Sequence, residues 1–454
     1  MGKPHVLAIP YPAQGHVIPL MELAQWLVTN GFNVTFVNTD FNHERVMKGL
    51  SQKNNIGDEI RLVSIPDGLA SWEDRNDLGK LTEAIFQVMP GKLEELIVKI
   101  NESNGNEITC IIADESMGWA LEVAEKMGIR RAAFWPAAAA MLALGLSIPK
   151  LIDDKIINNE GFPINNQMIR LSPTMPATST AHLAWTCIGD VTTQKIIFEV
   201  MVRNTKSVKV ADWLICNSTY ELEPEAFTLF PNILPIGPLL ASNRLGNSAG
   251  YFWPEDSACL KWLDLQPPRS VIYVAFGSFT IFDHNQFQEL ALGLELTDRP
   301  FLWVVRPDLT HNTIDPYPEG FRDRVAARAR MVGWAPQQKV LSHPSVACFL
   351  SHCGWNSTME GLSNGVPFLC WPYFADQFLN QSYICEVWKA GLGFKPDQSG
   401  IITQGEIKDK VDQVLSNQKF KERALELKEM ARGSVTEGGC SHKNFNNFIE
   451  WMKA

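Results

Sequence analysis

The chain contains no Cys-x-x-Cys pair, no Asp-x-Asp pair, and no Gly-x-Gly-x-x-Gly run after the first strand of either α/β block that its sequence predicts. The first absence, together with an odd number of cysteines, nine, argues against a disulfide framework and favours free thiols in a reducing compartment. The second absence leaves a divalent-metal clamp for a diphosphate without obvious ligands. The third argues against an NAD-dependent oxidoreductase.

Positive charge is scarce as well. Lys and Arg number 40 against 50 Asp and Glu, so the net charge is −10, and no cluster of basic residues stands out. A protein that binds DNA or RNA usually carries a basic patch, so we expect no nucleic-acid partner. An anionic ligand would have to be held by local groups, against the charge of the whole chain.

One uncharged run, residues 132–149, is close to the length that spans a membrane. Pro136 and Gly145 interrupt it and Pro149 bounds it, so we predict a buried helix start beside a pocket. No signal-peptide pattern opens the chain. We therefore expect a cytoplasmic protein without an integral membrane segment, and a monomer.

Strand and helix patterns alternate in two blocks. In the first, an apolar run at 5–11 precedes a helical pattern at 17–29 and a β-rich run at 32–38. In the second, a β-rich run at 270–276 precedes a helical pattern at 284–296. This alternation is typical of α/β doubly wound sheets, which bind ligands beyond the carboxyl ends of their strands.

The blocks are separated by a polar stretch, ASNRLGNSAG at 241–250, which has the composition of a flexible linker. The end of the chain shows an amphipathic pattern. The predicted parts are an N-terminal domain at 1–240, a linker at 241–255, a C-terminal domain at 256–436 and a final helical segment at 437–454.

The second block contains a candidate anion site. The apolar strand 347–350 leads into Ser351-His352-Cys353-Gly354, and a helix is predicted from about Asn356. A helix N-terminus attracts phosphate through its backbone N–H groups and its dipole. His352 can add a donor to the same anion. One turn beyond Asn356, the carboxylate of Glu360 suits the hydroxyl groups of a ribose better than a phosphate.

These residues lie within a longer stretch, Trp334 to Gln377, with HCGWNS at its centre. This stretch, the opening PYPAQGHVIP, the strand SVIYVAFGS and the late EGG at 437–439 resemble the plant family 1 UDP-glycosyltransferases. The resemblance implies a GT-B fold, in which two Rossmann-like domains face each other across a cleft. It also implies inverting transfer of a sugar from a UDP-sugar, and a last helix that returns to the N-terminal domain.

The resemblance also implies roles for individual residues of the donor site. Trp334 would stack on uracil and Ala335 would contact the base through its backbone; Gln337 and Glu360 would hold the ribose; Ser278, His352, Asn356 and Ser357 would hold the diphosphate, with Trp355 beside the sugar; Asp376 and Gln377 would bind the sugar hydroxyls.

His16 and Asp114 are the candidate catalytic residues. Taken alone, His16 in a strand-to-helix loop could be a surface histidine, and Asp114 after an apolar strand could cap the helix that follows. Both match catalytic positions of the family. The resemblance therefore implies that His16 is the general base and that Asp114 orients it.

The chain departs from the family at Pro136, where many relatives have a threonine that contacts the donor sugar. We expect an enzyme that transfers glucose from UDP-glucose to a hydroxyl of a small lipophilic acceptor, of the flavonoid, phenylpropanoid or terpenoid type, giving a β-O-glucoside. No metal and no other cofactor is expected. The alternatives are another donor, UDP-galactose or UDP-xylose, and a UDP-sugar binder without catalytic activity.

Overall fold

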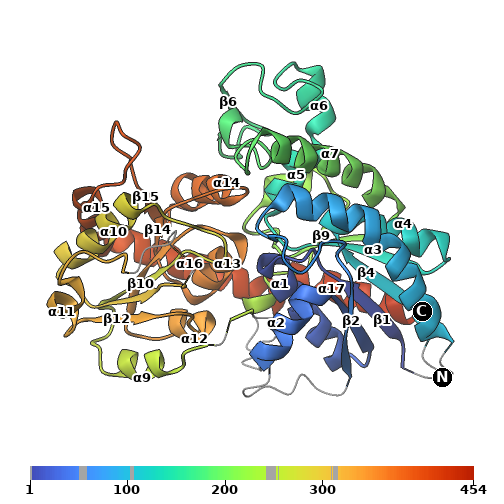
Figure 1. Ribbon diagram of the computed structural model, residues 1–454, viewed down its shortest axis with the longest axis horizontal. Coiled ribbons are helices and arrows are strands. Elements are labelled where there is room, and N and C mark those ends of the chain that lie inside the picture. The colour runs from blue at the N-terminus through green and yellow to red at the C-terminus, as the bar shows by residue number, and fades with distance from the viewer. Residues whose placement is uncertain are drawn as a thin grey trace. The chain divides into compact units, whose positions relative to one another are not determined.

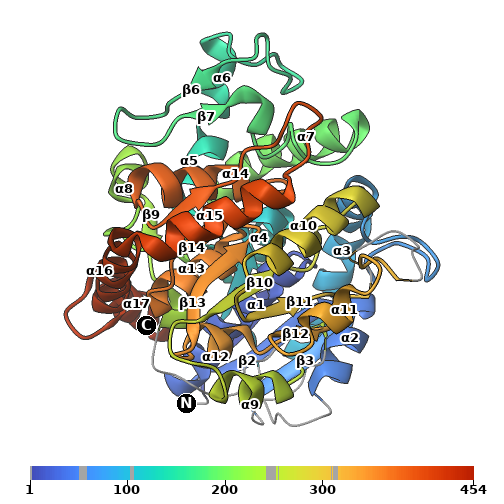
Figure 2. The same cartoon turned by 90° about the vertical axis from the view of Figure 1, so that its left-hand side faces the viewer.

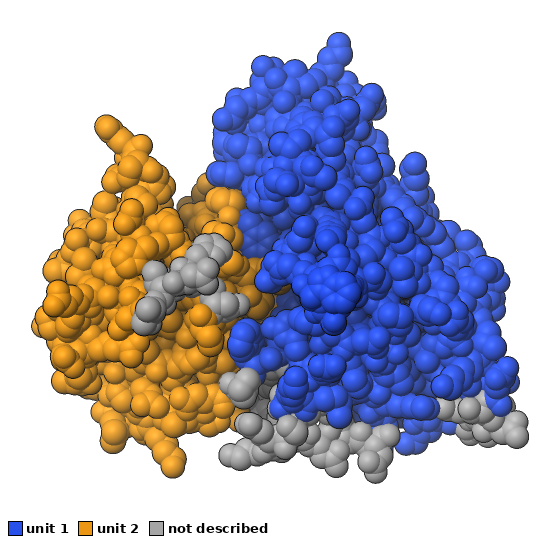
Figure 3. Space-filling view, in the orientation of Figure 1, with its two compact units in different colours: residues 1–253, 374–376, 432–454 blue, residues 254–373, 377–431 orange. Residues whose placement is uncertain are grey.

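Two parallel β-sheets, one in each predicted α/β block, form the frame of the chain (Figure 1). The computed structural model describes residues 3–50, 59–102, 107–241, 252–253, 255–307, 309 and 315–454. Its contacts divide the chain into two units, coloured separately in Figure 3. The first unit comprises residues 1–253, 374–376 and 432–454, and the second comprises 254–373 and 377–431.

The first unit is built on a seven-stranded parallel sheet with the order β3-β2-β1-β4-β5-β8-β9. Its strands are β1 His5–Ile9, β2 Asn33–Thr39, β3 Ile60–Ile65, β4 Cys110–Asp114, β5 Arg130–Trp135, β8 Trp213–Cys216 and β9 Ile233–Pro235. Its helices are α1 Gln14–Thr29, α2 Asp40–Leu50, α3 Leu78–Asn101, α4 Gly118–Lys126, α5 Ala139–Leu146, α6 Ile148–Asp153, α7 Val191–Ser207, α8 Pro224–Leu229 and α17 Cys440–Lys453. A short antiparallel pair, β6 Met168–Ile169 and β7 Thr178–Ser179, lies outside the main sheet.

Apolar side chains cover both faces of this sheet, as expected for buried parallel strands. Val6 and Ala8 of β1 pack into a core that includes α1, whereas Leu7 and Ile9 point into a second core that includes α3. The last helix, α17, places Phe445, Phe448, Ile449 and Met452 in the core shared with α1. The alternation of side chains along a strand explains why one short apolar run serves both cores.

The second unit contains a six-stranded parallel sheet with the order β12-β11-β10-β13-β14-β15. The strands are β10 Val271–Ala275, β11 Phe301–Val304, β12 Ala329–Val332, β13 Val346–Ser351, β14 Phe368–Cys370 and β15 Gly391–Gly393. The helices are α9 Ala258–Asp264, α10 His284–Leu296, α11 Phe321–Val325, α12 Gln337–Leu341, α13 Trp355–Asn364, α14 Gln377–Ser382, α15 Gln404–Ser416 and α16 Gln418–Val435, of which residues 432–435 belong to the first unit. Helices α10 and α15 pack side by side over this sheet (Figure 2).

The predicted α/β architecture with two doubly wound sheets is confirmed, and three local predictions are corrected. The uncharged run 132–149 contains the predicted start of a buried helix, α5, but its first residues belong to strand β5, because the Trp135-Pro136 step ends the strand and separates the two elements. The strand and helix pattern predicts a long helix from Gln377, but α14 is short and passes into a π-helical turn, Tyr383–Val387. The third correction concerns the start of α1 and is described with the site. Residues 242–251 and 254 of the predicted linker lie outside the described residues.

No helix within the described residues is long and apolar enough to cross a membrane. Within the run 132–149, the residues of β5 belong to the buried sheet and the residues of α5 form a short buried helix.

Candidate functional site

His16 lies in the first turn of α1, not in the loop that the sequence predicts. The backbone N–H groups of His16 and Val17 both donate to the carbonyl oxygen of Ala13, at 2.9 Å, so the helix begins three residues before the predicted start. Ala13 has the extended backbone of an N-cap residue but no side chain that can cap a helix. The start was missed because the sequence signal for an N-cap is a polar side chain.

Asp114 is the last residue of β4, at the carboxyl edge of the sheet beside β1. Its Oδ2 lies 2.7 Å from Nδ1 of His16, and its Oδ1 accepts a hydrogen bond from the backbone N–H of Ser116. Asp114 is fully buried, whereas the His16 side chain is 26% exposed. The carboxylate therefore caps the short helix after β4 and also holds the imidazole.

The bond through Nδ1 determines which ring nitrogen of His16 can take up a proton. A histidine that donates Nδ1–H to a carboxylate presents an unprotonated Nε2. Burial alone would lower the pKa of His16 and is the largest single effect. The charge and hydrogen bond of Asp114, with a contribution from Asp376, outweigh burial and raise the pKa above its ordinary value of 6.5.

Neighbouring groups of the site remain neutral. Burial, helped by the charge of Asp114, raises the pKa of Glu115 to about 8, so this carboxyl keeps its proton at neutral pH. Burial also raises the pKa of Tyr11 to about 12, and its hydroxyl bonds to Thr82 at 2.9 Å. The Tyr11 ring lies 5.3 Å from the His16 ring. Among these residues, Asp114 supplies the negative charge that faces His16.

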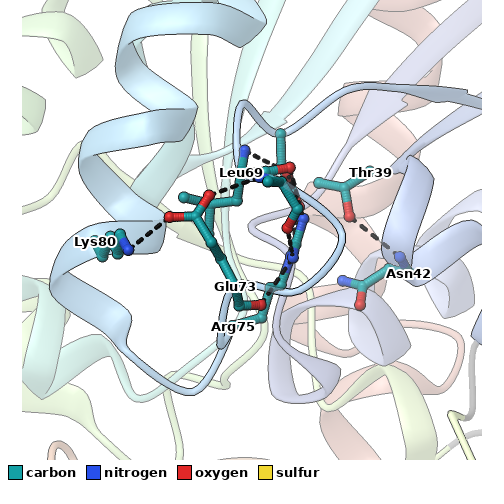
Figure 4. A network of polar contacts seen from close by, with 8 residues as sticks. Thr39, Asn42, Leu69, Glu73, Arg75 and Lys80 are labelled. Carbon is teal, nitrogen blue, oxygen red and sulfur yellow. Dashed lines mark hydrogen bonds and ion pairs between the residues drawn. The ribbon is translucent and has the colours of Figure 1, made fainter.

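Side chains also hold the loops at the carboxyl edge of this parallel sheet. Asn42, at the start of α2, donates to the carbonyl of Pro12 at 2.8 Å. In the loop between β3 and α3, Arg75 uses all five of its N–H groups, two on the Asp67 carboxylate and three on backbone carbonyls (Figure 4). Glu73 of the same loop pairs with Lys80 at 2.6 Å. These contacts hold two loops at the same edge of the sheet from which α1 and His16 begin.

Pro136, where the chain departs from the family, lies between β5 and α5. The indole N–H of Trp135 donates to the carbonyl of Ala138 at 2.7 Å, which closes the turn around Pro136. Glu223 caps α5 by accepting from the backbone N–H groups of Ala139 and Ala140, both at 2.9 Å. The turn is fixed by these contacts and offers no side-chain donor at Pro136.

In the second unit, β13 and α13 form the strand, turn and helix start at which the sequence predicts an anion site. Gly354 is the N-cap of α13, and the first hydrogen bond within the helix runs from the N–H of Thr358 to its carbonyl, at 2.9 Å. Cys353 has a left-handed φ of 66° and turns the chain from strand to helix. The carbonyl oxygen of Cys353 accepts a hydrogen bond from the side-chain NH₂ of Asn380, at 2.9 Å. Sequence reasoning did not identify Asn380 as part of this turn.

The His352 ring occupies the space that two glycines leave open. A Cβ atom at Gly354 would lie 2.5 Å from Nε2 of His352, and one at Gly277 would collide with the same atom. The pKa of His352 is lowered to about 4, first by burial and then by the positive charge of Arg306. His352 is therefore a neutral imidazole at pH 7, a hydrogen-bonding group without a charge.

The structure brings together three of the residues predicted for the ribose and diphosphate. The Gln337 side-chain NH₂ donates to Ser357 Oγ at 2.8 Å and to a carboxylate oxygen of Glu360 at 2.5 Å. The Gln337 carbonyl oxygen accepts from the hydroxyl of Tyr273, at 3.0 Å. Tyr273, on β10, therefore orients the Gln337 amide, a role that no local motif revealed because 64 residues separate the two.

The other residues predicted to bind the donor sugar nucleotide differ in location and burial. Trp334 and Asn356 are half-buried, Ser278 lies in the turn after β10, and Ala335 is buried. Trp355 is buried, and its ring lies 6.3 Å from that of Trp388.

Asp376 and Gln377 fall into different units. Asp376 is half-buried and belongs to the first unit, where its charge acts on His16. Gln377 is buried in the second unit, and its Oε1 accepts from the backbone N–H of Tyr373 at 2.7 Å. In the part of the chain that the structure describes, no group of three or more His, Cys, Asp or Glu residues is arranged to hold a metal ion.

Comparison with known proteins gives concordant results. Residues 187–436 match the family model described as "UDP-glucoronosyl and UDP-glucosyl transferase". UDP-glycosyltransferase 83A1 of Arabidopsis thaliana is 49% identical over 100% of this chain and 98% of its own length. Linamarin synthase 1 of Manihot esculenta is 34% identical over 98% of this chain and 96% of its own length.

Solved structures show the same fold. Os79 from O. sativa in complex with UDP is 27% identical, with a TM-score of 0.81 over 98% of this chain and 100% of that chain. A UDP-glucosyltransferase from Polygonum tinctorium capable of glucosylating indoxyl is 26% identical, with a TM-score of 0.83 over 100% of this chain and 99% of that chain.

Proposed function

The chain belongs to the plant family 1 UDP-glycosyltransferases and has their GT-B fold, and from this premise we propose that it transfers glucose from UDP-glucose to a hydroxyl group of a small lipophilic acceptor. The single observation that carries the catalytic part of this proposal is the pair formed by His16 and Asp114, in which Nδ1 is held by a buried carboxylate at 2.7 Å. This arrangement is that of a general base with its orienting group.

The proposed reaction proceeds by direct displacement. Nε2 of His16 takes the proton of the acceptor hydroxyl while its oxygen attacks the anomeric carbon of the sugar. The bond from that carbon to the diphosphate breaks, and UDP leaves with the bonding electron pair. Asp114 stabilises the imidazolium that forms. Attack opposite the leaving group inverts the α-linked donor and gives a β-O-glucoside.

Donor binding is assigned to the second unit. We propose that Trp334 stacks on uracil, that Gln337 and Glu360 hold the ribose, and that Ser278, Asn356, Ser357 and the N-terminus of α13 hold the diphosphate. Neutral His352 would donate a hydrogen bond to the same group. Charge that develops on the departing diphosphate would be met by these hydrogen bonds and by the helix dipole, without a metal ion.

The names of relatives and structural neighbours support a small acceptor. One Os79 structure contains trichothecene, Phytolacca americana UGT2 was solved with UDP-2fluoro-glucose and pterostilbene, and two relatives are called 7-deoxyloganetin glucosyltransferase. For this chain we propose acceptors of the flavonoid, phenylpropanoid or terpenoid type. A phenol, with a pKa near about 10, suits a histidine base better than an alkyl alcohol does. We also propose that the protein acts as a monomer in the cytoplasm.

A panel assay tests the proposed function. The protein is incubated with one of UDP-glucose, UDP-galactose or UDP-xylose, a set of phenolic and terpenoid acceptors, and excess chelator. We expect acceptor-dependent UDP release, a product heavier by one hexose in mass spectrometry, and a β-anomeric signal in NMR, with UDP-glucose the preferred donor. Binding of UDP-glucose without transfer to any acceptor would support a binder, and activity restored only by Mg²⁺ or Mn²⁺ would contradict the metal-free account.

A further inference from the structure

Arg306 is a buried arginine directly behind the turn that follows β10. It comes two residues after the end of β11, and it is 3% exposed. One of its terminal nitrogens donates to the carbonyl of Gly277, and the other donates to the carbonyl of Thr280 at 2.7 Å. The planar guanidinium therefore bridges the two ends of the turn 277–280, which contains Ser278.

This turn packs against the site at the start of α13. Gly277 has a left-handed φ of 65°, and the His352 ring fills the space that its missing side chain leaves. The charge of Arg306 is the second cause of the low pKa of His352, so the guanidinium lies close to the ring as well. Arg306, the turn and His352 thus form one packed assembly, although they come from three separate strand ends.

A fork of two parallel donors has a property that a single charge lacks. Arginine presents its N–H groups in a fixed plane and can hold two carbonyls at a set separation, whereas the lysine ammonium is a compact charge on a flexible stem. Removing either bond would free one end of the turn. The backbone and hydroxyl of Ser278 would then lose their fixed position relative to His352 and α13.

We propose that Arg306 is a positioning residue for the donor diphosphate: by bridging the carbonyls of Gly277 and Thr280, it fixes the Ser278 turn in the geometry that receives the diphosphate. This inference rests on the proposed function, which assigns Ser278 and His352 to the diphosphate. It extends that function to a residue that does not itself contact the donor.

The test compares two ligands that differ only in the diphosphate. Dissociation constants for UDP and for uridine are measured by calorimetry for the parent protein, Arg306→Lys and Arg306→Gln. Arg328→Met is the matched control, because Arg328 also donates to two backbone carbonyls, those of Arg324 and Glu295, in the same unit. Circular dichroism and melting curves establish that each variant is folded.

We expect Arg306→Lys to weaken UDP binding by about tenfold or more, since hydrogen bonds to charged groups are the strong ones, and to leave uridine binding within about twofold. Arg328→Met should change neither constant. In steady-state kinetics, kcat should fall more than KM rises, because negative charge on the diphosphate increases in the transition state.

Three results would overturn the inference. Unchanged UDP binding in both Arg306 variants would show that the turn 277–280 receives the diphosphate without the two hydrogen bonds from the guanidinium. An equal loss for UDP and uridine would assign Arg306 to the stability of the unit as a whole. A parent protein that binds uridine as tightly as UDP would contradict the diphosphate site of the proposed function itself, and the inference with it.

Discussion

Asp114 holds His16 with one carboxylate oxygen and the backbone of Ser116 with the other. A sequence interpretation would treat the helix cap and the orienting carboxylate as alternatives, yet this residue does both. The two bonds fix the carboxylate in the plane that faces Nδ1 of His16. The position of the proposed base is therefore set at the carboxyl edge of the sheet: Asp114 ends β4, and the first turn of α1, which carries His16, follows the adjacent parallel strand β1.

The raised pKa of His16 predicts the pH dependence of the reaction. The proposed base must be unprotonated, and its pKa lies above 6.5, so kcat/KM should rise with pH through a midpoint above 6.5. In Asp114→Asn the two raising effects of Asp114 on the pKa of His16 are lost, whereas the larger lowering effect of burial and the smaller raising effect of Asp376 remain. The midpoint should therefore fall, together with the rate, in a pH–rate profile with a phenol acceptor. Asp190→Asn, which replaces the N-cap of α7, is the control, and the same midpoint in parent and Asp114→Asn would contradict the prediction.

Gly277→Ala should weaken UDP binding. The new Cβ would collide with the His352 ring, and the left-handed φ of 65° is strained for alanine. Gly405→Ala, in α15 with an ordinary φ and no atom closer than 4.0 Å to the added Cβ, is the matched control and should bind UDP as the parent does. A UDP titration by calorimetry measures both variants, and parental affinity in Gly277→Ala would show that the turn can move without loss.

Much of this architecture could be predicted from the sequence, because buried parallel strands are short apolar runs and the helices between them end at Gly or polar residues. Helix α10 was predicted with its observed bounds. The start of α1 could not be predicted, since Ala13 carries no capping side chain. The hydrogen bonds from Arg306 to Gly277 and Thr280 could not be predicted either, because a single arginine after a strand is expected at the surface until its burial is known.

The charge states of the site residues could not be predicted from the sequence either. His352 follows a strand in the sequence, but only the packing of its ring between two glycines and near Arg306 makes it a neutral group at pH 7. Likewise, Gln337 and Glu360 were predicted to contact the ribose. The hydrogen bond that joins them, and the one from Tyr273 that orients Gln337, depend on tertiary contacts across 23 and 64 residues.

Glu360→Ala should weaken UDP binding through loss of the ribose contacts. Hydrogen bonds to a charged acceptor contribute about 1.5–3 kcal/mol each, and the Gln337 amide would lose its carboxylate partner as well. Glu422→Ala, an exposed glutamate in α16, serves as the control. Calorimetry with UDP measures both, and an unchanged dissociation constant in Glu360→Ala would remove this residue from the donor site.

The last helix should be needed for stability of the first unit. Phe448 of α17 is fully buried in the core that includes α1, so Phe448→Ala should lower the free energy of unfolding by about 3–5 kcal/mol. Asn447→Ala, at the exposed neighbouring position, should change it by less than about 0.5 kcal/mol. Thermal melting distinguishes them, and equal melting temperatures would mean that α17 contributes little to this core.

The central claim is that His16 is the general base and takes no part in donor binding, and the most direct measurement pairs the single-turnover rate of His16→Ala with its UDP affinity. Loss of a general base costs typically about 10²–10⁴-fold in rate, and a weakly acidic acceptor belongs at the upper end. The account predicts this loss with an alkyl alcohol acceptor, together with an unchanged UDP dissociation constant. A His16→Ala protein that transfers glucose to an alkyl alcohol at near-parental rate, or one that loses UDP affinity as strongly as rate, would contradict it.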